Sequence, residues 1–168
     1  MRRLLALTAL LPPTVHAAPT VRAPNLAALN QGQILCYDAI VEIDRREDAP
    51  KVRQAEEQIA AALRGLGLRA QEFDAAERCH RVLAFTFRMN NIGAPMLYKA
   101  SLELQTLMAY DGDVDINVAT IWDTEHWGAD RQEVTPARVS ALFREILTEQ
   151  LQTFKDDYRS LASAGSRS

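Results

Sequence analysis

Residues 98–122 read YKASLELQTLMAYDGDVDINVATIW, and this stretch decides the fold. Apolar and polar residues alternate through its first half, which is the period-2 pattern of a half-buried strand. Asp111 and Gly112 then form a two-residue turn, because both positions need a positive φ that Asp tolerates and Gly adopts freely. The alternation resumes up to Trp122. The stretch therefore predicts an antiparallel hairpin with one face on a core and the other toward solvent.

The same alternation predicts strands upstream of the hairpin. Residues 34–44 and 80–89 each have an apolar row and a more polar row. A shorter strand is predicted over residues 68–73. The rows expected to face the core are Leu35, Tyr37, Ala39, Val41 and Ile43 in the first strand, and Leu83, Phe85, Phe87 and Met89 in the second.

Two amphipathic helices complete the pattern. Asp48, which precedes Ala49-Pro50, suits an N-cap with proline in the first turn, and apolar residues then recur at helical spacing until Gly65 and Gly67 end the helix. Thr135 followed by Pro136 predicts a second helix start, with an apolar stripe behind it over about 28 residues. Ser163 to Ser168 are expected to fray.

The order β-α-β-β-β-β-α predicts an α+β fold, a two-layer α/β sandwich. We expect a mostly antiparallel sheet of four or five strands, with the two helices packed on one face, in a single domain over residues 33–162. Residues 18–32 are expected to form an extended leader. The opposite sheet face would be left open, with a mixed surface made by Asp38, Ile40, Glu42, Thr86, Arg88, Lys99, Ser101, Glu103, Gln105, Asn117 and Ile121.

The first 17 residues predict export. Arg2 and Arg3 give a positive start, an apolar run follows, and Val15-His16-Ala17 forms a small-residue cleavage pattern before Ala18. The apolar run is about eight residues, far short of the roughly 20 that span a bilayer. No cysteine follows it to accept a lipid. The sequence therefore predicts a protein of the periplasm or extracellular space, without stable membrane insertion after cleavage.

Composition and charge exclude several classes. Hydrophobic residues make up 48% of the chain and charged residues 24%, as in ordinary globular proteins, so a disordered or collagenous chain is excluded. The chain has 19 Lys and Arg against 22 Asp and Glu; removal of Arg2 and Arg3 with the signal leaves 17 against 22, a net charge of −5. Without a clustered basic surface, nucleic acid is not expected as a partner.

Cys36 and Cys79 predict a disulfide, because an even number of thiols in an oxidising compartment usually pairs. Two separately buried thiols are the alternative that the sequence leaves open. A metal or redox site is disfavoured, since there is no C-x-x-C motif.

Four elements follow one another over residues 33–162: the helix ending Leu63-Arg64-Gly65-Leu66-Gly67, the strand 81–88, the hairpin around Asp111-Gly112, and the closing helix from Thr135. In this order, and with an export signal, they resemble the small cell-envelope domains typified by the N-terminal domain of TolB and by auxiliary lipoproteins of outer-membrane transport systems. The resemblance implies a binding or assembly module of the envelope. It carries over no functional residue, and the lipobox cysteine of the auxiliary lipoproteins is absent here.

Candidate chemical sites are weak. Asp111, Asp113 and Asp115 have the spacing of the first calcium ligands of an EF-hand loop, but the later glycine and glutamate of that loop are missing, so a plain turn is favoured. His80 and His126 could form a metal pair, although isolated histidines are more often solvated. There is no G-x-S-x-G, S-x-x-K or glycine-rich phosphate loop. We therefore expect no catalytic residue, metal or cofactor.

The predicted function is protein binding. Ile40, Ile121 and Trp127 are the candidate partner surface, since exposed aromatic and aliphatic side chains anchor interfaces. Trp122, in contrast, is expected to be buried in the core beneath a helix. The partner would be another envelope protein or a second copy of this chain. Two alternatives stay open: an envelope hydrolase with an unrecognised site, and a carrier of a small apolar ligand.

Overall fold

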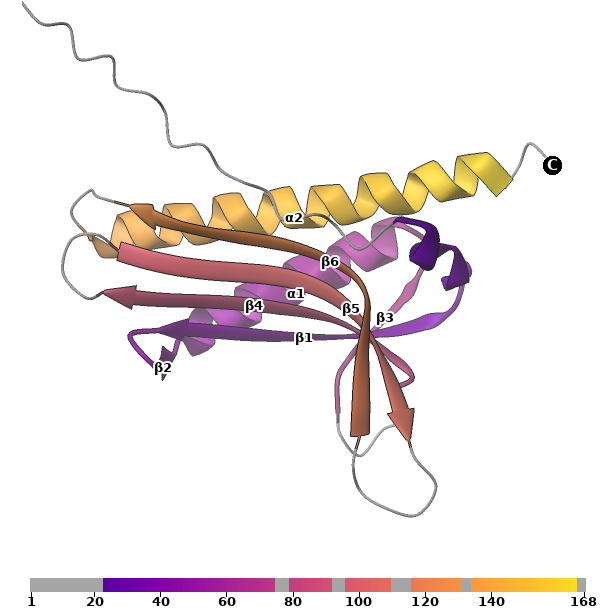
Figure 1. Cartoon of the computed structure of the whole chain (residues 1–168), viewed down its shortest axis with the longest axis horizontal. Coiled ribbons are helices and arrows are strands. Elements are labelled where there is room, and N and C mark those ends of the chain that lie inside the picture. The colour runs from indigo at the N-terminus through magenta and orange to yellow at the C-terminus, as the bar shows by residue number, and fades with distance from the viewer. Residues whose placement is uncertain (1–22, 75–78, 92–95, 110–115, 131–133, 166–168) are drawn as a thin grey trace, which may run out of the picture.

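The computed structural model describes residues 23–74, 79–91, 96–109, 116–130 and 134–165. These residues form a sheet with two long helices behind it, as Figure 1 shows. In chain order the elements are η1 (Ala23–Ala28), β1 (Ile34–Ile43), β2 (Arg46–Glu47), α1 (Ala49–Gly65), β3 (Arg69–Glu72), β4 (Arg81–Asn91), β5 (Met96–Ala109), β6 (Ile116–Asp130) and α2 (Pro136–Gly165).

The sheet confirms the α+β prediction but contains more strands and a more mixed topology. Its order is β2-β1-β4-β5-β6, with β3 also paired to β1, which makes six strands rather than four or five. The pairs of β1 with β3 and with β4 are parallel, and the other three pairs are antiparallel. The β1–β3 pair is parallel because α1 carries the chain back to the start of β1. The β1–β4 pair is parallel because the connection after β3 returns the chain to that end of the sheet a second time.

Both helices pack on one face of the sheet, as the sequence predicts. The apolar stripe of α2 supplies Phe143, whose ring meets Phe85 and Phe87 edge to face at centroid distances of 6.0 and 5.6 Å. Such edge-to-face pairs suit the opposite charges of ring edge and ring face. Side chains from β1, β4, β5, β6 and both helices form one continuous core. No helix in the described part of the chain is long and apolar enough to cross a membrane.

Both predicted helix starts are confirmed by their caps. The Asp48 carboxylate accepts the backbone N–H of Lys51 at 3.2 Å and also pairs with the Lys51 ammonium at 2.7 Å. The Thr135 hydroxyl accepts the N–H of Arg138 in the same way. At the other end of α1, Gly67 takes a φ of +77°, the left-handed conformation that closes a helix C-terminus.

The N-terminal residues differ from the predicted extended leader. Within residues 18–32 the structure has the short helix η1, and Leu26 and Leu29 are buried in the main core. The amide of Asn25 donates to the Ile121 carbonyl at 2.6 Å, which ties η1 to β6. The core therefore includes residues before 33, because Leu26 and Leu29 pack into it. The predicted signal at residues 1–17 lies outside the described residues and stays a prediction.

The hairpin of β5 and β6 bends sharply part-way along its length. A register irregularity lies between Leu104 and Gln105, where β6 has one extra residue. Such a bulge bends the strand and strengthens its twist. Beyond it the strands turn away from the sheet and project as a two-stranded arm (Figure 1). The predicted Asp111-Gly112 turn lies outside the described residues, although the antiparallel pairing on both sides of it is confirmed.

The predicted disulfide between Cys36 and Cys79 is present, with a Cα–Cα distance of 6.0 Å. Cys36 lies on β1, and Cys79 lies just before β4, whereas β3 pairs with β1 on the other side. The chain from β3 to β4 must therefore cross β1. Phe73, Val82 and Ala84 pack with the two cysteines in a second, small apolar cluster. The disulfide thus fastens the crossing segment to the strand that it crosses.

Candidate functional site: the outer sheet face and the β6 edge

The sheet face opposite the helices, here called the outer face, is crossed by ordered rows of side chains. Cross-strand register places Glu42, Arg88, Lys99 and Trp127 in one row over β1, β4, β5 and β6. Arg88 pairs with Glu42 at 2.9 Å, and Lys99 pairs with Glu125 in the neighbouring row. These ion pairs neutralise the cations of the row but leave Trp127 in contact with solvent.

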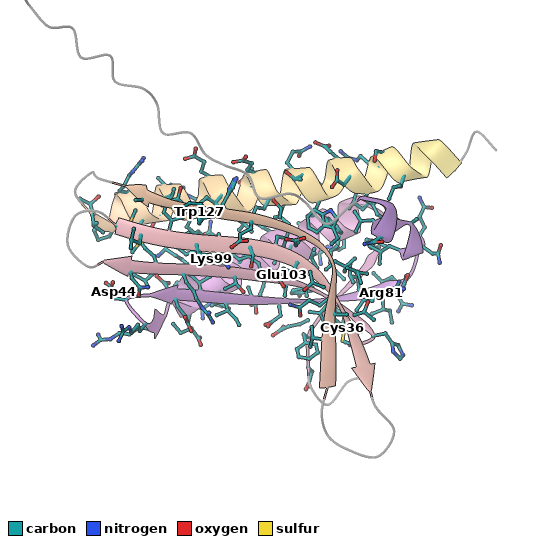
Figure 2. All side chains as sticks on the ribbon, in the orientation of Figure 1. Cys36, Asp44, Arg81, Lys99, Glu103 and Trp127 are labelled. Atoms are coloured by element: carbon teal, nitrogen blue, oxygen red, sulfur yellow. A yellow bond between two sulfur atoms is a disulfide. The ribbon has the colours of Figure 1, made fainter. Side chains whose placement is uncertain are left out.

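Trp127 is the most exposed large apolar side chain of the described residues. It is 62% exposed, and Leu97 on the neighbouring strand is 43% exposed. Leu97 pairs with Ala129 and Lys99 pairs with Trp127, so Leu97 and Trp127 are diagonal neighbours on the same face. We call Leu97, Trp127 and Ala129 the Trp127 patch. Figure 2 shows Trp127 and Lys99 on adjoining strands, at the end of the sheet away from Cys36.

The other two candidate contact residues do not join this patch. Ile40 is 40% exposed on the outer face, but its row runs over Thr86 and Ser101 to Glu125, which leaves two strands between Ile40 and β6. Ile121 is only half-exposed and packs against the main core. The extra residue in β6 explains this correction, because a bulge breaks the strict alternation that placed Ile121 on the outer face. Leu97 was missed; its apolar side chain in an otherwise polar row was the available signal.

The β6 strand forms one edge of the sheet. In the described part of the chain it pairs only with β5. Asn25 holds the edge at Ile121, so the accessible part begins beyond that contact. We call residues 123–129 the β6 edge. An edge strand presents backbone N–H and C=O groups that a further strand can pair with.

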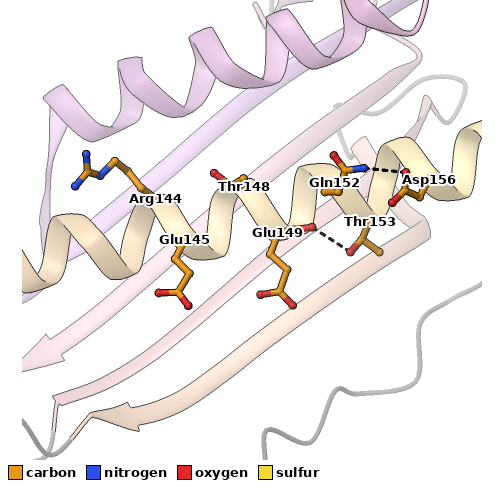
Figure 3. A pocket seen from close by; sticks show the side chains of 7 residues that line it. All are labelled: Arg144, Glu145, Thr148, Glu149, Gln152, Thr153 and Asp156. Atoms are coloured by element: carbon orange, nitrogen blue, oxygen red, sulfur yellow. Dashed lines mark hydrogen bonds between the residues drawn. The ribbon is translucent and has the colours of Figure 1, made fainter.

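Carboxylates flank the β6 edge on the helix side as well. Figure 3 shows Glu145 and Glu149 pointing from α2 toward the β6 side, whereas Arg144 points toward α1. The Glu149 carboxylate lies 3.6 Å from the imidazole of His126 on β6. A shallow, open hollow of about 670 Å³ lies over the exposed side of α2, lined by Arg144, Glu145, Thr148, Glu149, Gln152, Thr153 and Asp156. All seven belong to one helix, so the hollow is a groove over its polar side.

A buried amide fixes α2 onto the β5–β6 ladder. Gln150 is 1% exposed, and its Nε2 donates to the carbonyls of Ala100 and Thr124 at 3.3 Å each. These bonds hold the helix in register with the two strands. The same placement of the helix brings the exposed Glu149 within 3.6 Å of His126.

The structure does not bring the two predicted histidines together. His80 is exposed just before β4, whereas His126 pairs with Ala100, which itself pairs with Phe87 near the far end of β4. Among the described residues, no group of three or more His, Cys, Asp and Glu side chains is placed to hold a metal ion. The aspartates at 111, 113 and 115 lie outside those residues.

Acidic side chains also gather at the opposite edge of the sheet. Burial raises the pKa of the Glu56 carboxyl on α1, and the nearby Glu72 and Asp38 raise it further, while Arg53 lowers it. Burial likewise raises the pKa of Tyr37, with Glu72 and Glu56 adding to the effect. Ionisation of Glu56 is therefore opposed first by its burial and then by the neighbouring carboxylates.

Replacing Glu56 by Gln should raise the thermal stability of the protein at pH 7. The folded-state pKa of Glu56 lies above its unfolded value, so its ionisation favours the unfolded chain as pH rises through that range. Below the unfolded pKa both states hold the proton, and the gain should vanish. Melting temperatures of wild type and Glu56→Gln between pH 3.5 and 7 measure this. A gain that persists unchanged at the acid end would contradict a charge effect and indicate packing instead.

Comparison with known proteins gives matches at the level of structure. No protein-family model and no curated protein sequence matches the chain. A PelC dodecamer from Paraburkholderia phytofirmans is 14% identical, with 86% of this chain and 98% of that chain covered and a TM-score of 0.44. A Xanthomonas campestris protein of the family DUF330 is 14% identical, with coverages of 83% and 90% and a TM-score of 0.45.

A third solved structure is a neuraminyllactose-binding hemagglutinin homolog from Helicobacter pylori. It is 12% identical, with 83% of this chain and 91% of that chain covered and a TM-score of 0.42. None of these three matches bears on the resemblance to TolB-type domains, which stays a prediction.

Proposed function

We propose that this chain is an exported, non-catalytic protein of the cell envelope that binds another protein through its outer sheet face and β6 edge. The observation that carries the proposal is the Trp127 patch, in which a tryptophan 62% exposed and a leucine 43% exposed adjoin on the sheet face opposite the helices. Tryptophan in such a position is a typical interface anchor, since it gains a large apolar area when a partner covers it.

Two further observations support this function. The Cys36–Cys79 disulfide fits the oxidising compartment that the predicted signal leads to, the periplasm or the extracellular space. The Trp127 patch also lies beside charged groups that are already paired, such as Lys99 with Glu125. An apolar centre with a polar rim is the usual anatomy of a protein interface.

The two alternatives lack an observation in their favour. A hydrolase needs a hollow in which ionisable groups converge, and the groove along α2 is lined by one helix only. In the smaller hollow that holds Asp48 and Lys51, these two groups already pair with each other as part of the α1 cap. A carrier needs an enclosed apolar space between sheet and helices. Bulky side chains occupy that layer, with Trp122, Phe85, Phe87, Phe143 and Phe154 all fully buried.

Site-specific photocrosslinking tests the proposed surface. A benzophenone amino acid at position 127 or 97, in cells that export the chain, should give a discrete protein adduct. Position 57 serves as the matched control, because Glu57 is exposed on α1, on the helix side of the sheet. Adducts of the same size and yield from position 57, or no adduct from either patch position, would contradict the proposal.

A further inference from the structure

The charged side chains beside the β6 edge determine which kind of strand can pair with it. On the outer face Asp123 and Glu125 project from β6 with Trp127 next to them, and Glu125 pairs with Lys99 of β5. On the helix side Glu145 and Glu149 of α2 face β6. A strand beside β6 would have its side chains opposite both sets, since cross-strand neighbours lie about 5 Å apart. The contact of His126 with Glu149 shows that α2 reaches the side chains of this edge.

We propose that the β6 edge binds an extended, basic segment of a partner protein, which adds to the sheet as a further strand. This rests on the proposed function and names the partner's chemistry: Lys or Arg side chains that face carboxylates on either side of the edge. Main-chain hydrogen bonds to the edge would give affinity, and the alternating basic side chains would give specificity. One cation would stack on the exposed indole of Trp127.

A second copy of this chain is the less suitable occupant of the β6 edge. Pairing β6 with β6 of another copy would bring the Asp123 and Glu125 rows against each other. Like charges opposite each other destabilise strand pairs, and acidic residues on an edge discourage self-pairing. The carboxylates along the edge therefore disfavour pairing with the chain's own edge and favour a strand of opposite charge.

Fluorescence anisotropy with a labelled nonapeptide, Lys-Val-Lys-Thr-Lys-Val-Lys-Thr-Lys, tests the inference on the full-length mature protein. We expect saturable binding. Two control peptides are used: the same sequence N-methylated at alternate residues, and a version with Glu in place of Lys. Each should bind at least about tenfold more weakly than the Lys peptide, which corresponds to about 1.4 kcal/mol of binding free energy. Equal binding of the N-methylated peptide would overturn strand addition, because it retains every charge but loses backbone donors.

Matched charge reversals locate the binding. The double variant Glu145→Lys/Glu149→Lys changes two exposed side chains of α2 and should weaken binding of the Lys peptide about tenfold. The control, Glu57→Lys/Glu72→Lys, makes the same change in net charge at exposed positions near the opposite sheet edge and should bind within about twofold of wild type. Equal weakening by both pairs, or weakening by the control pair alone, would overturn the assignment to β6.

The two proposals fail separately. Discrete crosslinks from position 127 together with no binding of the Lys peptide would overturn the basic-strand inference but leave the Trp127 patch as a protein contact. Absence of crosslinks from position 127 together with intact binding of the Lys peptide would overturn the Trp127 patch as a protein contact but leave the β6 edge as a binding site for a basic strand.

Discussion

Removal of the Cys36–Cys79 disulfide is expected to lower the free energy of unfolding by about 4 kcal/mol. The bridge joins residues 43 apart in sequence, and closing a loop of that length removes about this much conformational freedom from the unfolded chain in the loop-entropy estimate. The loss is a large share of the 5–15 kcal/mol typical of a folded domain. It should also loosen the segment that crosses β1 between β3 and β4, since the bridge is its covalent anchor there.

Urea unfolding of wild type and of Cys36→Ala/Cys79→Ala, each with and without dithiothreitol, measures this effect. Reductant should shift the wild-type midpoint toward that of the double variant and leave the variant unchanged. A wild-type midpoint that does not respond to reductant would contradict a stabilising bridge.

Replacement of Trp122 by Ala is expected to cost about 3–5 kcal/mol, the range for large aromatic truncations in a core. Trp122 is fully buried, its ring meets Phe154 edge to face at 5.1 Å, and its Nε1–H donates to Asp157 at 2.9 Å. It therefore joins β6 to α2 next to the bulge where the hairpin bends. The cavity left behind would lie between these elements and could not collapse without moving α2.

Trp122→Phe separates packing from hydrogen bonding at the same position. It keeps an aromatic ring against Phe154 but leaves the Asp157 carboxylate without the indole donor, at an expected cost of about 1–2 kcal/mol. Chemical denaturation of both variants gives the comparison. Equal losses in the free energy of unfolding for Trp122→Phe and Trp122→Ala would contradict the view that ring packing supplies most of the stabilisation by Trp122.

The fold could be predicted to the level of its layers but not of its strand partners. Alternation over residues 34–44, 80–89 and 98–104 gives each of these strands a core-facing side, and the caps at Asp48 and Thr135 mark the two helix starts. Beyond the bulge the prediction fails, since Val118 of the expected core row is 52% exposed. Periodicity does not say which strands are neighbours. The parallel pairing of β1 with β3 follows from the return through α1, and that of β1 with β4 from a second return after β3. Neither neighbour is marked by the periodicity of a strand.

The candidate site was predictable only in part. Trp127 is exposed because it follows Trp122 by an odd number of positions, and alternation places the two on opposite faces. Ile121 was misplaced because one extra residue in β6 changes the facing of the strand, and nothing local in the sequence marks that bulge. The acidic flank of the β6 edge combines residues of β6 and α2, and only the packing through Gln150 brings them together.

Binding of a partner at the Trp127 patch requires that the helices cover only one face of the sheet and that Trp127, on the other face, is accessible to solvent. Acrylamide quenching of single-tryptophan variants tests it most directly, because the two tryptophans report on opposite faces. In Trp122→Phe the remaining Trp127 should emit at long wavelength and be quenched strongly, whereas in Trp127→Phe the buried Trp122 should emit at shorter wavelength and resist quenching. Strong protection of Trp127 in the dilute, isolated protein would contradict the account.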